Sequence, residues 1–398
     1  MKLSVTVPTK ENHYEVADIF HCYGDQYRQC NNTSYEQNKV MGHIQTCRTA
    51  ALGGHIEKCN ECGYEKITYN SCRDRHCPKC QIITKERWLN DRKSELLSCG
   101  YFHLVFTLPH TLNPIILNNK RIMLGILFAA VNETLQAFAR DPQWRLNGQL
   151  GIVAVLHTWS QTLLDHFHIH CLVPAGALST SNQWTPARQS FLFRIKSLAK
   201  EYRKRYLQKL QKAYLQKELI FPGKTTSLGS QSVFAEMIKK LSETEWIAYA
   251  KRPFAGPKQV LEYLGRYTHR IAISNNRLIA IDNGRVVFTY RDRKNNNEKK
   301  TMDLSADEFI RRFLLHVLPK GFMKIRYFGF LSNIKKRECI QIIRLITDSK
   351  KELLEQAKET VQQIIQRVTG IDITCCPLCH KGKMITIKEL PNLIGDTS

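Results

Sequence analysis

The sequence is short of acidic residues and of long hydrophobic runs, and both shortages exclude classes of protein. Its 398 residues hold 35 Asp and Glu against 59 Lys and Arg, a formal net charge of +24. The longest apolar run, Ile122 to Val131 with one glycine, is far below the roughly 20 residues of a membrane span. The amino end, Met1-Lys2-Leu3, lacks the apolar core of a signal peptide. We therefore expect a cytoplasmic protein.

Positive charge is abundant instead. An excess of this size favours a polyanionic partner, and nucleic acid is the first expectation. With 43% hydrophobic residues the chain can bury two or three cores, so it is neither disordered nor fibrous.

Cysteines are also frequent, 14 in all, and several have the spacing of metal ligands. Cys59 and Cys62 form one CxxC knuckle, and Cys77 and Cys80 form another. Two such knuckles supply the four thiolates of a tetrahedral zinc ion. A second set of zinc ligands interleaves with them: Cys47, His55, Cys72 and His76. The sequence predicts two structural zinc ions.

The zinc ligands lie in an expected amino-terminal domain, residues 1–100, in which Arg73 and Arg75 are candidate DNA contacts. A catalytic domain is expected over residues 101–345, and a helix with a cysteine-containing tail over 346–398. In this tail Cys376 and Cys379 form only half a metal site, to which Cys375 or His380 could add a ligand. We leave this half-site unassigned.

Histidines recur at every second position from His166 to His170. On a strand, this spacing places three imidazoles on one face. The segment Gly151–Trp159 is also predicted as a strand, and pairing the two places His157 opposite His168, with His170 on the diagonal. Opposed and diagonal residues lie about 5 and about 7 to 8 Å apart. We therefore predict that His157, His168 and His170 hold one metal ion.

Two tyrosines, Tyr263 and Tyr267, lie four residues apart in a predicted helix, 257–267, and so share one helix face. A phenolate that attacks a phosphodiester forms a covalent phosphotyrosine, and a nearby cation offsets the charge of the transition state. The histidines would then supply the metal site, and the tyrosines would supply the nucleophile. Basic residues flank the tyrosines and are candidate DNA contacts: Lys258, Arg266 and Arg270.

Sheet and helix alternate after about residue 100, which predicts an α+β fold. Expected elements include a strand over Tyr101–Thr107, a helix over Ile122–Phe138 and a hairpin that turns at Asp282-Asn283-Gly284. Ser305 and Glu308 have the spacing of a capping box for a helix over residues 308–317.

Several motifs together resemble the rolling-circle transposases of the insertion sequence 91 type, within the HUH (His-hydrophobe-His) endonuclease superfamily. They extend over nearly the whole chain: residues 47–55, 69–73, 76–80, 157–159, 166–170, 263–275 and 311–322.

The resemblance implies a central antiparallel sheet of the HUH-endonuclease type, flanked by helices, with His168 and His170 as its metal-binding pair. It implies that Tyr263 and Tyr267 are the nucleophiles, that His157 is a third ligand, and that the catalytic ion is Mg²⁺ or Mn²⁺. Three imidazoles alone would also suit zinc or nickel. The implied function is nicking and rejoining of single-stranded DNA through a 5′-phosphotyrosine, which mobilises an insertion sequence in a bacterial cytoplasm, on nucleoid or plasmid.

Three alternatives stay open from the sequence. A plasmid replication initiator or relaxase would use the same chemistry on an origin. A non-catalytic zinc-finger DNA-binding protein would use the histidines structurally. A zinc hydrolase would never become covalently attached to its substrate, and no Glu or Asp stands at a recognised zinc-hydrolase spacing.

Overall fold

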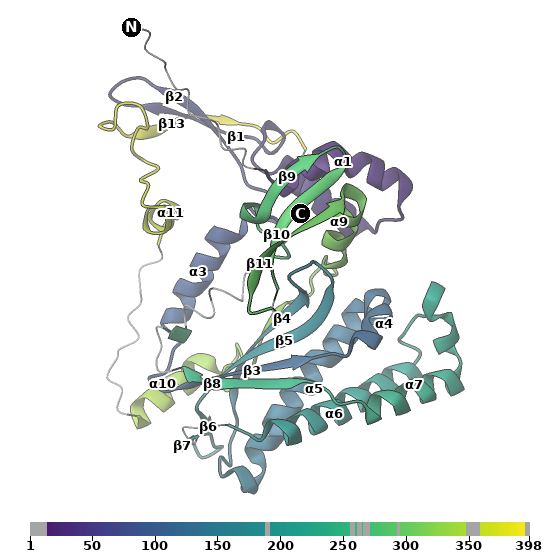
Figure 1. Ribbon diagram of the computed structural model, residues 1–398. Coiled ribbons are helices and arrows are strands. Elements are labelled where there is room, and N and C mark those ends of the chain that lie inside the picture. Colours follow the sequence, from purple (N-terminus) through teal and green to yellow (C-terminus); the bar gives the residue numbers. More distant parts are fainter. Residues whose placement is uncertain are drawn as a thin grey trace.

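A five-stranded antiparallel sheet lies at the centre of the computed structural model, which describes residues 14–187, 192–254, 259–260, 265, 271–292, 295–347 and 359–394 (Figure 1). The strand order is β12-β4-β5-β3-β8, and each neighbouring pair is antiparallel. The strands are β3 (Tyr101–Thr107), β4 (Gly151–Trp159), β5 (Asp165–Pro174), β8 (Ala248–Phe254) and β12 (Ile325–Gly329).

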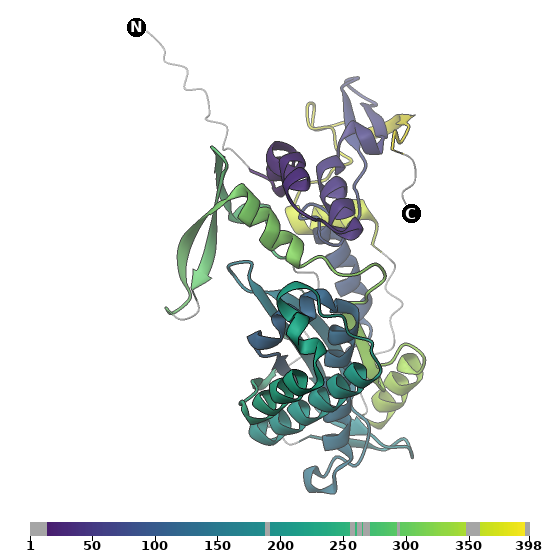
Figure 2. The same ribbon diagram turned by 90° about the vertical axis from the view of Figure 1, so that its right-hand side faces the viewer.

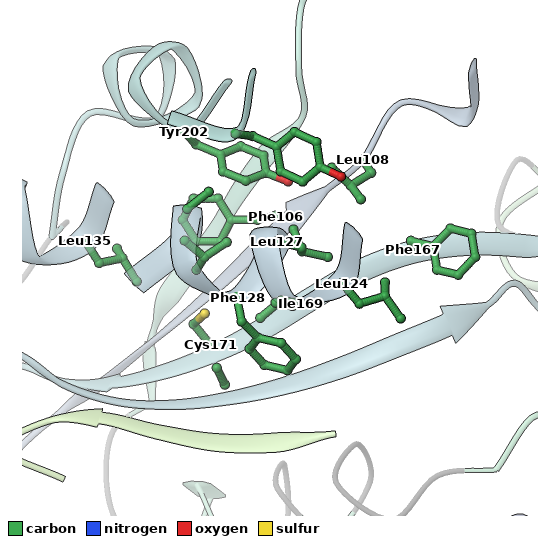
Figure 3. Packing of buried hydrophobic residues seen from close by; sticks show 14 of the residues in the cluster. Phe106, Leu108, Leu124, Leu127, Phe128, Leu135, Phe167, Ile169, Cys171 and Tyr202 are labelled. Carbon is green, nitrogen blue, oxygen red and sulfur yellow. The ribbon is translucent and has the colours of Figure 1, made fainter. Parts of the chain in front are cut away.

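Helices cover one face of this sheet: α4 (Asn113–Asn118), α5 (Lys120–Arg140), α6 (Ile195–Leu215) and α7 (Gln231–Glu243). Alternation along the strands sends Phe106, Ile169 and Cys171 toward this layer, where they pack with Phe128 of α5 and Tyr202 of α6 (Figure 3). Each of these side chains is at most 1% exposed. Burying one such apolar side chain stabilises the fold by about 1.5 to 3 kcal/mol.

Helix α5 is, within the described parts of the chain, the one helix long and apolar enough to cross a membrane. Its apolar residues are instead the centre of this core, since Met123, Leu124, Leu127 and Phe128 are fully buried. Packing of the helix on both the sheet and α6 explains its composition.

The amino-terminal part holds α1 (Val16–Cys30), α2 (Tyr35–Thr46), a hairpin of β1 (Gly54–Cys59) and β2 (Glu65–Tyr69), and α3 (Gln81–Lys93). A strand from the far end of the chain, β13 (Met384–Leu390), pairs with β1 to give a three-stranded sheet of order β13-β1-β2. The cysteine-containing tail therefore contributes a strand to the amino-terminal sheet.

A second three-stranded sheet consists of β9 (Leu278–Asp282), β10 (Arg285–Asp292) and β11 (Glu298–Ser305), followed by α9 (Ala306–Leu315). Figure 2 shows this sheet projecting from the body of the molecule. Helix α9 packs on α1, where the rings of Phe20 and Phe313 meet edge to face with centroids 5.4 Å apart. The β9–β11 sheet, α9 and the amino-terminal helices thus share one apolar cluster.

A further apolar cluster lies on the other face of the central sheet. Ile340 and Ile343 of α10 (Lys336–Ile346) belong to it together with Val153 and Val155 of β4. The remaining elements include a short hairpin of β6 (Gly176–Leu178) and β7 (Trp184–Pro186), and α11 (Val361–Thr369).

The predicted α+β class, with an antiparallel sheet flanked by helices, is confirmed. Strands β3 and β4 have their predicted bounds, and the hairpin turns at Asn283 and Gly284, which both have positive φ as a two-residue turn requires. The first strand of that hairpin begins at Leu278, directly after a 3-10 turn over Asn275–Arg277. The predicted helix 257–267 falls largely outside the described residues.

Candidate functional site

Strands β4 and β5 bring three histidines together on one face of the central sheet. His157 lies directly opposite His168, and His170 lies on the diagonal, opposite Val155. This register is the one predicted from the sequence. One nitrogen from each of the three rings lies within 4.8 Å of the others, and the ring centroids are 4.6 to 5.3 Å apart. Such a spacing lets three imidazoles converge on a single ion of the size of Mg²⁺, Mn²⁺ or Zn²⁺.

Hydrogen-bond contacts engage Nδ1 in two of these rings. Nδ1 of His168 lies 2.8 Å from the carbonyl oxygen of His166, and Nδ1 of His170 lies 2.9 Å from Nε2 of His103. Because Nδ1 is engaged in both rings, Nε2 is the nitrogen suited to bind a metal. The donor set therefore fits a divalent cation.

His103 is a neighbour of the site that the sequence did not predict. It lies on β3, the neighbour of β5, and on the face that Tyr101 and Thr107 share, so alternation along the predicted strand could have placed it near the histidines. A lone histidine in an apolar strand carries little signal by itself.

A cleft of about 390 Å³ opens beside the three histidines. The β10 strand of the projecting sheet supplies one wall through Tyr290, Arg291 and Asp292. The opposite wall belongs to the β4–β5 hairpin and to the loop that joins its strands, with one further residue, His110, from the turn after β3. The hairpin and loop residues are His157, Trp159, Ser160, Gln161, Thr162, Leu164, Asp165, His166, His168 and His170. The cleft is therefore shared between the central sheet and the β9–β11 sheet.

Asp165 is the carboxyl group on the hairpin wall of this cleft. Burial raises its pKa, although Arg311 and Lys120 act in the opposite direction.

The predicted nucleophiles Tyr263 and Tyr267 lie outside the described residues, as do the candidate DNA contacts Lys258, Arg266 and Arg270. Gly265, between the tyrosines, is described: a Cβ at this position would lie 2.9 Å from a Leu89 methyl group of α3. Gly265 itself therefore lies close to α3.

Cys47, Cys72, Cys77 and Cys80 form one cluster of four sulfurs at the junction of α2, the β1–β2 hairpin and α3. Sγ of Cys80 lies 3.5 Å from Sγ of Cys47 and 3.6 Å from Sγ of Cys72. Cys47, Cys77 and Cys80 are buried, so this site is closed to solvent on most sides. Four thiolates with this spacing suit a structural zinc ion.

The expected grouping of the two CxxC knuckles is wrong, because the Cys77 knuckle does not join the Cys59 knuckle. Strand β1 carries Cys59 away from Gly54, at its base, by five residue steps, or roughly 17 Å at 3.3 Å per residue. Cys47 and Cys72 flank the base of the hairpin, where Arg48 N–H donates to the Asn70 carbonyl oxygen. Cys59 and Cys62, the distal knuckle, therefore cluster with other cysteines.

Those partners are Cys376 and Cys379, which complete a second cluster with Cys59 and Cys62. Sγ of Cys59 lies 3.7 Å from Sγ of Cys379, and Sγ of Cys62 lies 3.6 Å from Sγ of Cys376. Hydrogen bonds from the backbone N–H groups of Gly382 and Lys381 lower the pKa of Cys379 to about 6. The half-site left unassigned in the sequence thus lies against the distal knuckle.

The structure does not bring His55 and His76 into either sulfur cluster. Nε2 of His55 lies 3.7 Å from a Glu57 carboxylate oxygen, and Nδ1 of His76 lies 3.0 Å from a carboxylate oxygen of Asp74. Burial lowers the pKa of His76. Their spacing from the cysteines in sequence was misleading, because Cys77 and Cys80 take the places expected for the two histidines beside Cys47 and Cys72.

The two candidate DNA contacts in the amino-terminal part differ in their surroundings. Arg73 is exposed, with φ of 55°. Arg75 is half-buried, and its guanidinium donates to the carbonyl oxygens of Phe322 and Pro319. These bonds give Arg75 a role in holding the 318–322 loop.

Comparisons with known proteins point to one family of transposases. Residues 151–338 match a family described as "Putative transposase", and residues 19–108 match the "Transposase zinc-binding domain" of insertion sequence 91 elements. The chain is 45% identical over 387 residues to "Putative transposase y4qJ" of Sinorhizobium fredii, with 96% of each chain covered. It is 30% identical over 320 residues to the "Transposase for insertion sequence element IS801" of Pseudomonas savastanoi pv. phaseolicola, covering 79% of this chain and 74% of the relative. No solved structure matches the chain.

The fold is α+β, with a histidine cluster on its central sheet and cysteine clusters in a zinc-binding domain. Together with these relatives, it defines a DNA transposase. The chain belongs to the insertion sequence 91 family of transposases. The predicted resemblance is confirmed, and DNA is the partner that a transposase requires.

Proposed function

We propose that the protein nicks and rejoins single-stranded DNA through a 5′-phosphotyrosine, and so mobilises its insertion sequence by a rolling-circle-like route in the bacterial cytoplasm. The observation that supports this most is the convergence of His157, His168 and His170 on one face of the β4–β5 hairpin. Three imidazoles beside a cleft, two of them oriented through Nδ1, are a suitable site for an ion that contacts substrate.

The residues that would hold the ion are His157, His168 and His170, through one ring nitrogen of each. A bound Mg²⁺ or Mn²⁺ would withdraw negative charge from the non-bridging oxygens of the scissile phosphate. Three protein ligands leave positions open for phosphate oxygens and water, which favours a weakly held, exchangeable ion over a closed structural one.

In the proposed reaction, the phenol oxygen of Tyr263 or Tyr267 forms a bond to phosphorus. The bond from phosphorus to the 3′ oxygen breaks, and the proton lost by the phenol balances the one gained by the departing 3′-hydroxyl. The bond energy is kept in the phosphotyrosine, so a 3′-hydroxyl can later reverse the step on another strand. The second tyrosine would accept or cleave the other strand end.

The cleft offers contacts for a DNA chain at this point. Arg291 can neutralise a backbone phosphate, and the rings of Tyr290 and Trp159 can stack on unpaired bases. Stacking needs bases that are not paired, which supports a single-stranded substrate. Arg73, Lys258, Arg266 and Arg270 remain proposed DNA contacts.

In the amino-terminal domain we propose that Cys47, Cys72, Cys77 and Cys80 hold one structural zinc ion. This ion would fix α2, the β1–β2 hairpin and α3 to one another, because each of these elements begins or ends near a ligand. The proposed division into residues 1–100, 101–345 and 346–398 places this ion in the first part.

A test of the nucleophiles uses labelled single-stranded ends of the element with Mn²⁺. Wild-type protein should give a covalent DNA adduct on a denaturing gel, and the double variant Tyr263→Phe/Tyr267→Phe should give none. Tyr290→Phe is the matched control, because this phenol also borders the cleft beside the histidines. An adduct that persists in the double variant and disappears in Tyr290→Phe would identify Tyr290 of β10 as the nucleophile instead.

A second variant separates catalysis from binding. His168→Ala should abolish cleavage but keep most of the DNA affinity, since affinity depends mainly on Lys and Arg. DNA binding without any cleavage in the wild type would favour the zinc-finger alternative, and hydrolysis without a covalent adduct would favour the hydrolase alternative.

A further inference from the structure

Two cysteines near the end of the chain lie beside two near its beginning. Cys59 ends β1, Cys62 lies in the turn that follows, and Cys376 and Cys379 precede β13. All four sulfurs lie within 4.8 Å of one another. Cys59 and Cys379 are 320 residues apart in the sequence, and Cys62 and Cys376 are 314 residues apart. Their proximity is therefore a property of the fold and not of local spacing.

The backbone around these sulfurs has the form of two metal-binding knuckles. The N–H groups of Glu61 and Cys62 donate to Sγ of Cys59 at 3.4 and 3.5 Å. In the carboxyl-terminal knuckle, Leu378 N–H donates to Sγ of Cys376 and Gly382 N–H donates to Sγ of Cys379, both at 3.4 Å. Such bonds stabilise negative charge on sulfur, which is the form that binds a metal.

Packing around the knuckles leaves no room for a larger residue at Gly382. A Cβ at this position would collide with Sγ of Cys59 and with the Cβ of Glu61. The sulfur separations between the knuckles, 3.6 and 3.7 Å, are also far above the roughly 2.05 Å of a disulfide. They are close to the edge of a zinc-thiolate tetrahedron with Zn–S bonds of about 2.3 Å.

The tail is held to the amino-terminal part on both sides of this cluster. After it, β13 pairs with β1, from Cys59 opposite Met384 to Gly54 opposite Leu390. Before it, Arg367 of α11 forms an ion pair of 3.0 Å with Glu86 of α3. These contacts are modest, because β13 is mostly exposed and the ion pair is partly solvated.

We propose that Cys59, Cys62, Cys376 and Cys379 bind a second structural Zn²⁺ as a tetrathiolate, which fastens the carboxyl-terminal tail to the amino-terminal hairpin. Each cysteine loses its thiol proton when the Zn–S bonds form, and no oxidant is needed. Four protein ligands close the coordination shell, so this ion supports folding and takes no part in DNA cleavage. The proposal is independent of the tyrosine chemistry, and the family's zinc-binding match ends at residue 108, before two of the four ligands.

The test counts zinc in full-length protein by elemental analysis. Wild type should hold two zinc ions per chain, and Cys376→Ser/Cys379→Ser should hold one. Cys375→Ser is the matched control and should keep two, because Cys375 is adjacent but outside the cluster. Cys72→Ser/Cys77→Ser should lose the other ion. Two ions retained in Cys376→Ser/Cys379→Ser, or an equal count of one in this variant and the wild type, would overturn the proposal.

A second measurement reports on the fastening itself. Hydrogen exchange of β13 should be slow in wild type and in Cys375→Ser, and faster by at least tenfold in Cys376→Ser/Cys379→Ser, with the central sheet unchanged. Exchange of β13 that is equally slow in all three proteins would show that the strand pairing holds the tail without metal, and would contradict the proposed role. Titration of free thiols completes the test: a disulfide within this set in zinc-loaded protein is a further contradicting result.

Discussion

Nε2 of His103 lies 2.9 Å from Nδ1 of His170, across the pairing of β3 with β5. His103 is only 2% exposed, so this contact is shielded from water. A histidine that binds a metal through Nε2 carries its proton on Nδ1, and the proton needs an acceptor. We therefore propose that His103 is a positioning residue, which sets both the tautomer and the orientation of His170.

Replacing His103 should weaken metal binding without removing a ligand. His103→Phe keeps a ring but has no acceptor, and should lower Mn²⁺ affinity by about 10- to 100-fold. His103→Gln offers a carbonyl oxygen that can accept the same proton, and should recover most of this loss. Calorimetric titration with Mn²⁺ measures both effects, and metal-free DNA binding serves as the check on folding. Equal Mn²⁺ affinity in the wild type and His103→Phe would exclude the positioning role, whereas no Mn²⁺ binding in the wild type would contradict the proposed catalytic site.

Arg291 is expected to contact the DNA backbone in the cleft. Arg291→Ala should weaken single-stranded DNA binding and reduce the slope of log affinity against log salt by about 0.7, the value for one phosphate contact on a single strand. Arg285→Ala is the charge-matched control, since Arg285 lies at the other end of β10 and pairs with Asp303 at 3.0 Å. Fluorescence anisotropy at several salt concentrations measures the slopes. Identical losses in both variants would mean that only net charge matters.

Much of the histidine site was predictable because it depends on one hairpin. Alternation along two adjacent strands and a short loop fix the register, so His157, His168 and His170 could be placed from sequence alone. The contribution of β10 was not predictable in this way. Tyr290 and Arg291 reach the cleft because the second sheet is held against the β4–β5 loop, where Arg277 and Arg312 donate hydrogen bonds to the carbonyl oxygens of Gln161 and Thr162.

The grouping of the zinc ligands, in contrast, could not be predicted from the sequence. The CxxC spacing identifies a knuckle, but it does not say which knuckle is its partner. Here β1 separates Cys59 from Cys77, and the segment before β13 supplies Cys376 and Cys379, 314 and 320 residues from their partners. Which knuckles cluster depends on which strands are neighbours, and the sequence does not give this. The domain boundaries expected at residues 100 and 345 likewise stay predictions.

Glu308 gives a pH-dependent contribution to stability. Hydrogen bonds from Arg311 lower its pKa to about 2, with further help from Arg312. The folded pKa is below the unfolded value of about 4.3, so the stabilisation is complete above roughly pH 5 and is lost as the pH falls toward 2. Since these side chains are partly exposed, we expect about 1 kcal/mol.

The corresponding variant is Glu308→Gln. Ser305 Oγ accepts a hydrogen bond from the backbone N–H at position 308, which the substitution leaves in place. Thermal melts should therefore show lower stability for Glu308→Gln at about pH 7, with a difference from the wild type that shrinks toward about pH 3. A difference that stays constant over this range would mean that packing, and not the carboxylate charge, is responsible.

Gly329 ends β12 opposite Gly151 and has φ of +63°, in the left-handed region that favours glycine. A Cβ at this position would collide with the Leu150 carbonyl oxygen, which accepts a hydrogen bond from Gln136 at 3.0 Å. The backbone cannot move aside without breaking that bond. Gly284, with φ of +74°, is the matched control, because a Cβ there would have no other atom within 4 Å.

Both Gly→Ala substitutions incur the left-handed backbone cost of about 1 to 2 kcal/mol. Gly329→Ala adds a steric cost of about 1 to 3 kcal/mol, because it also displaces the edge of the central sheet next to β4. Melting temperatures should fall in the order wild type, Gly284→Ala, Gly329→Ala. If the two variants melted together, the close approach of β12 to Leu150 would not constrain the sheet. If Gly329→Ala were the less stable, as expected, its Mn²⁺ affinity should also fall, because β12 supports the strand that carries His157.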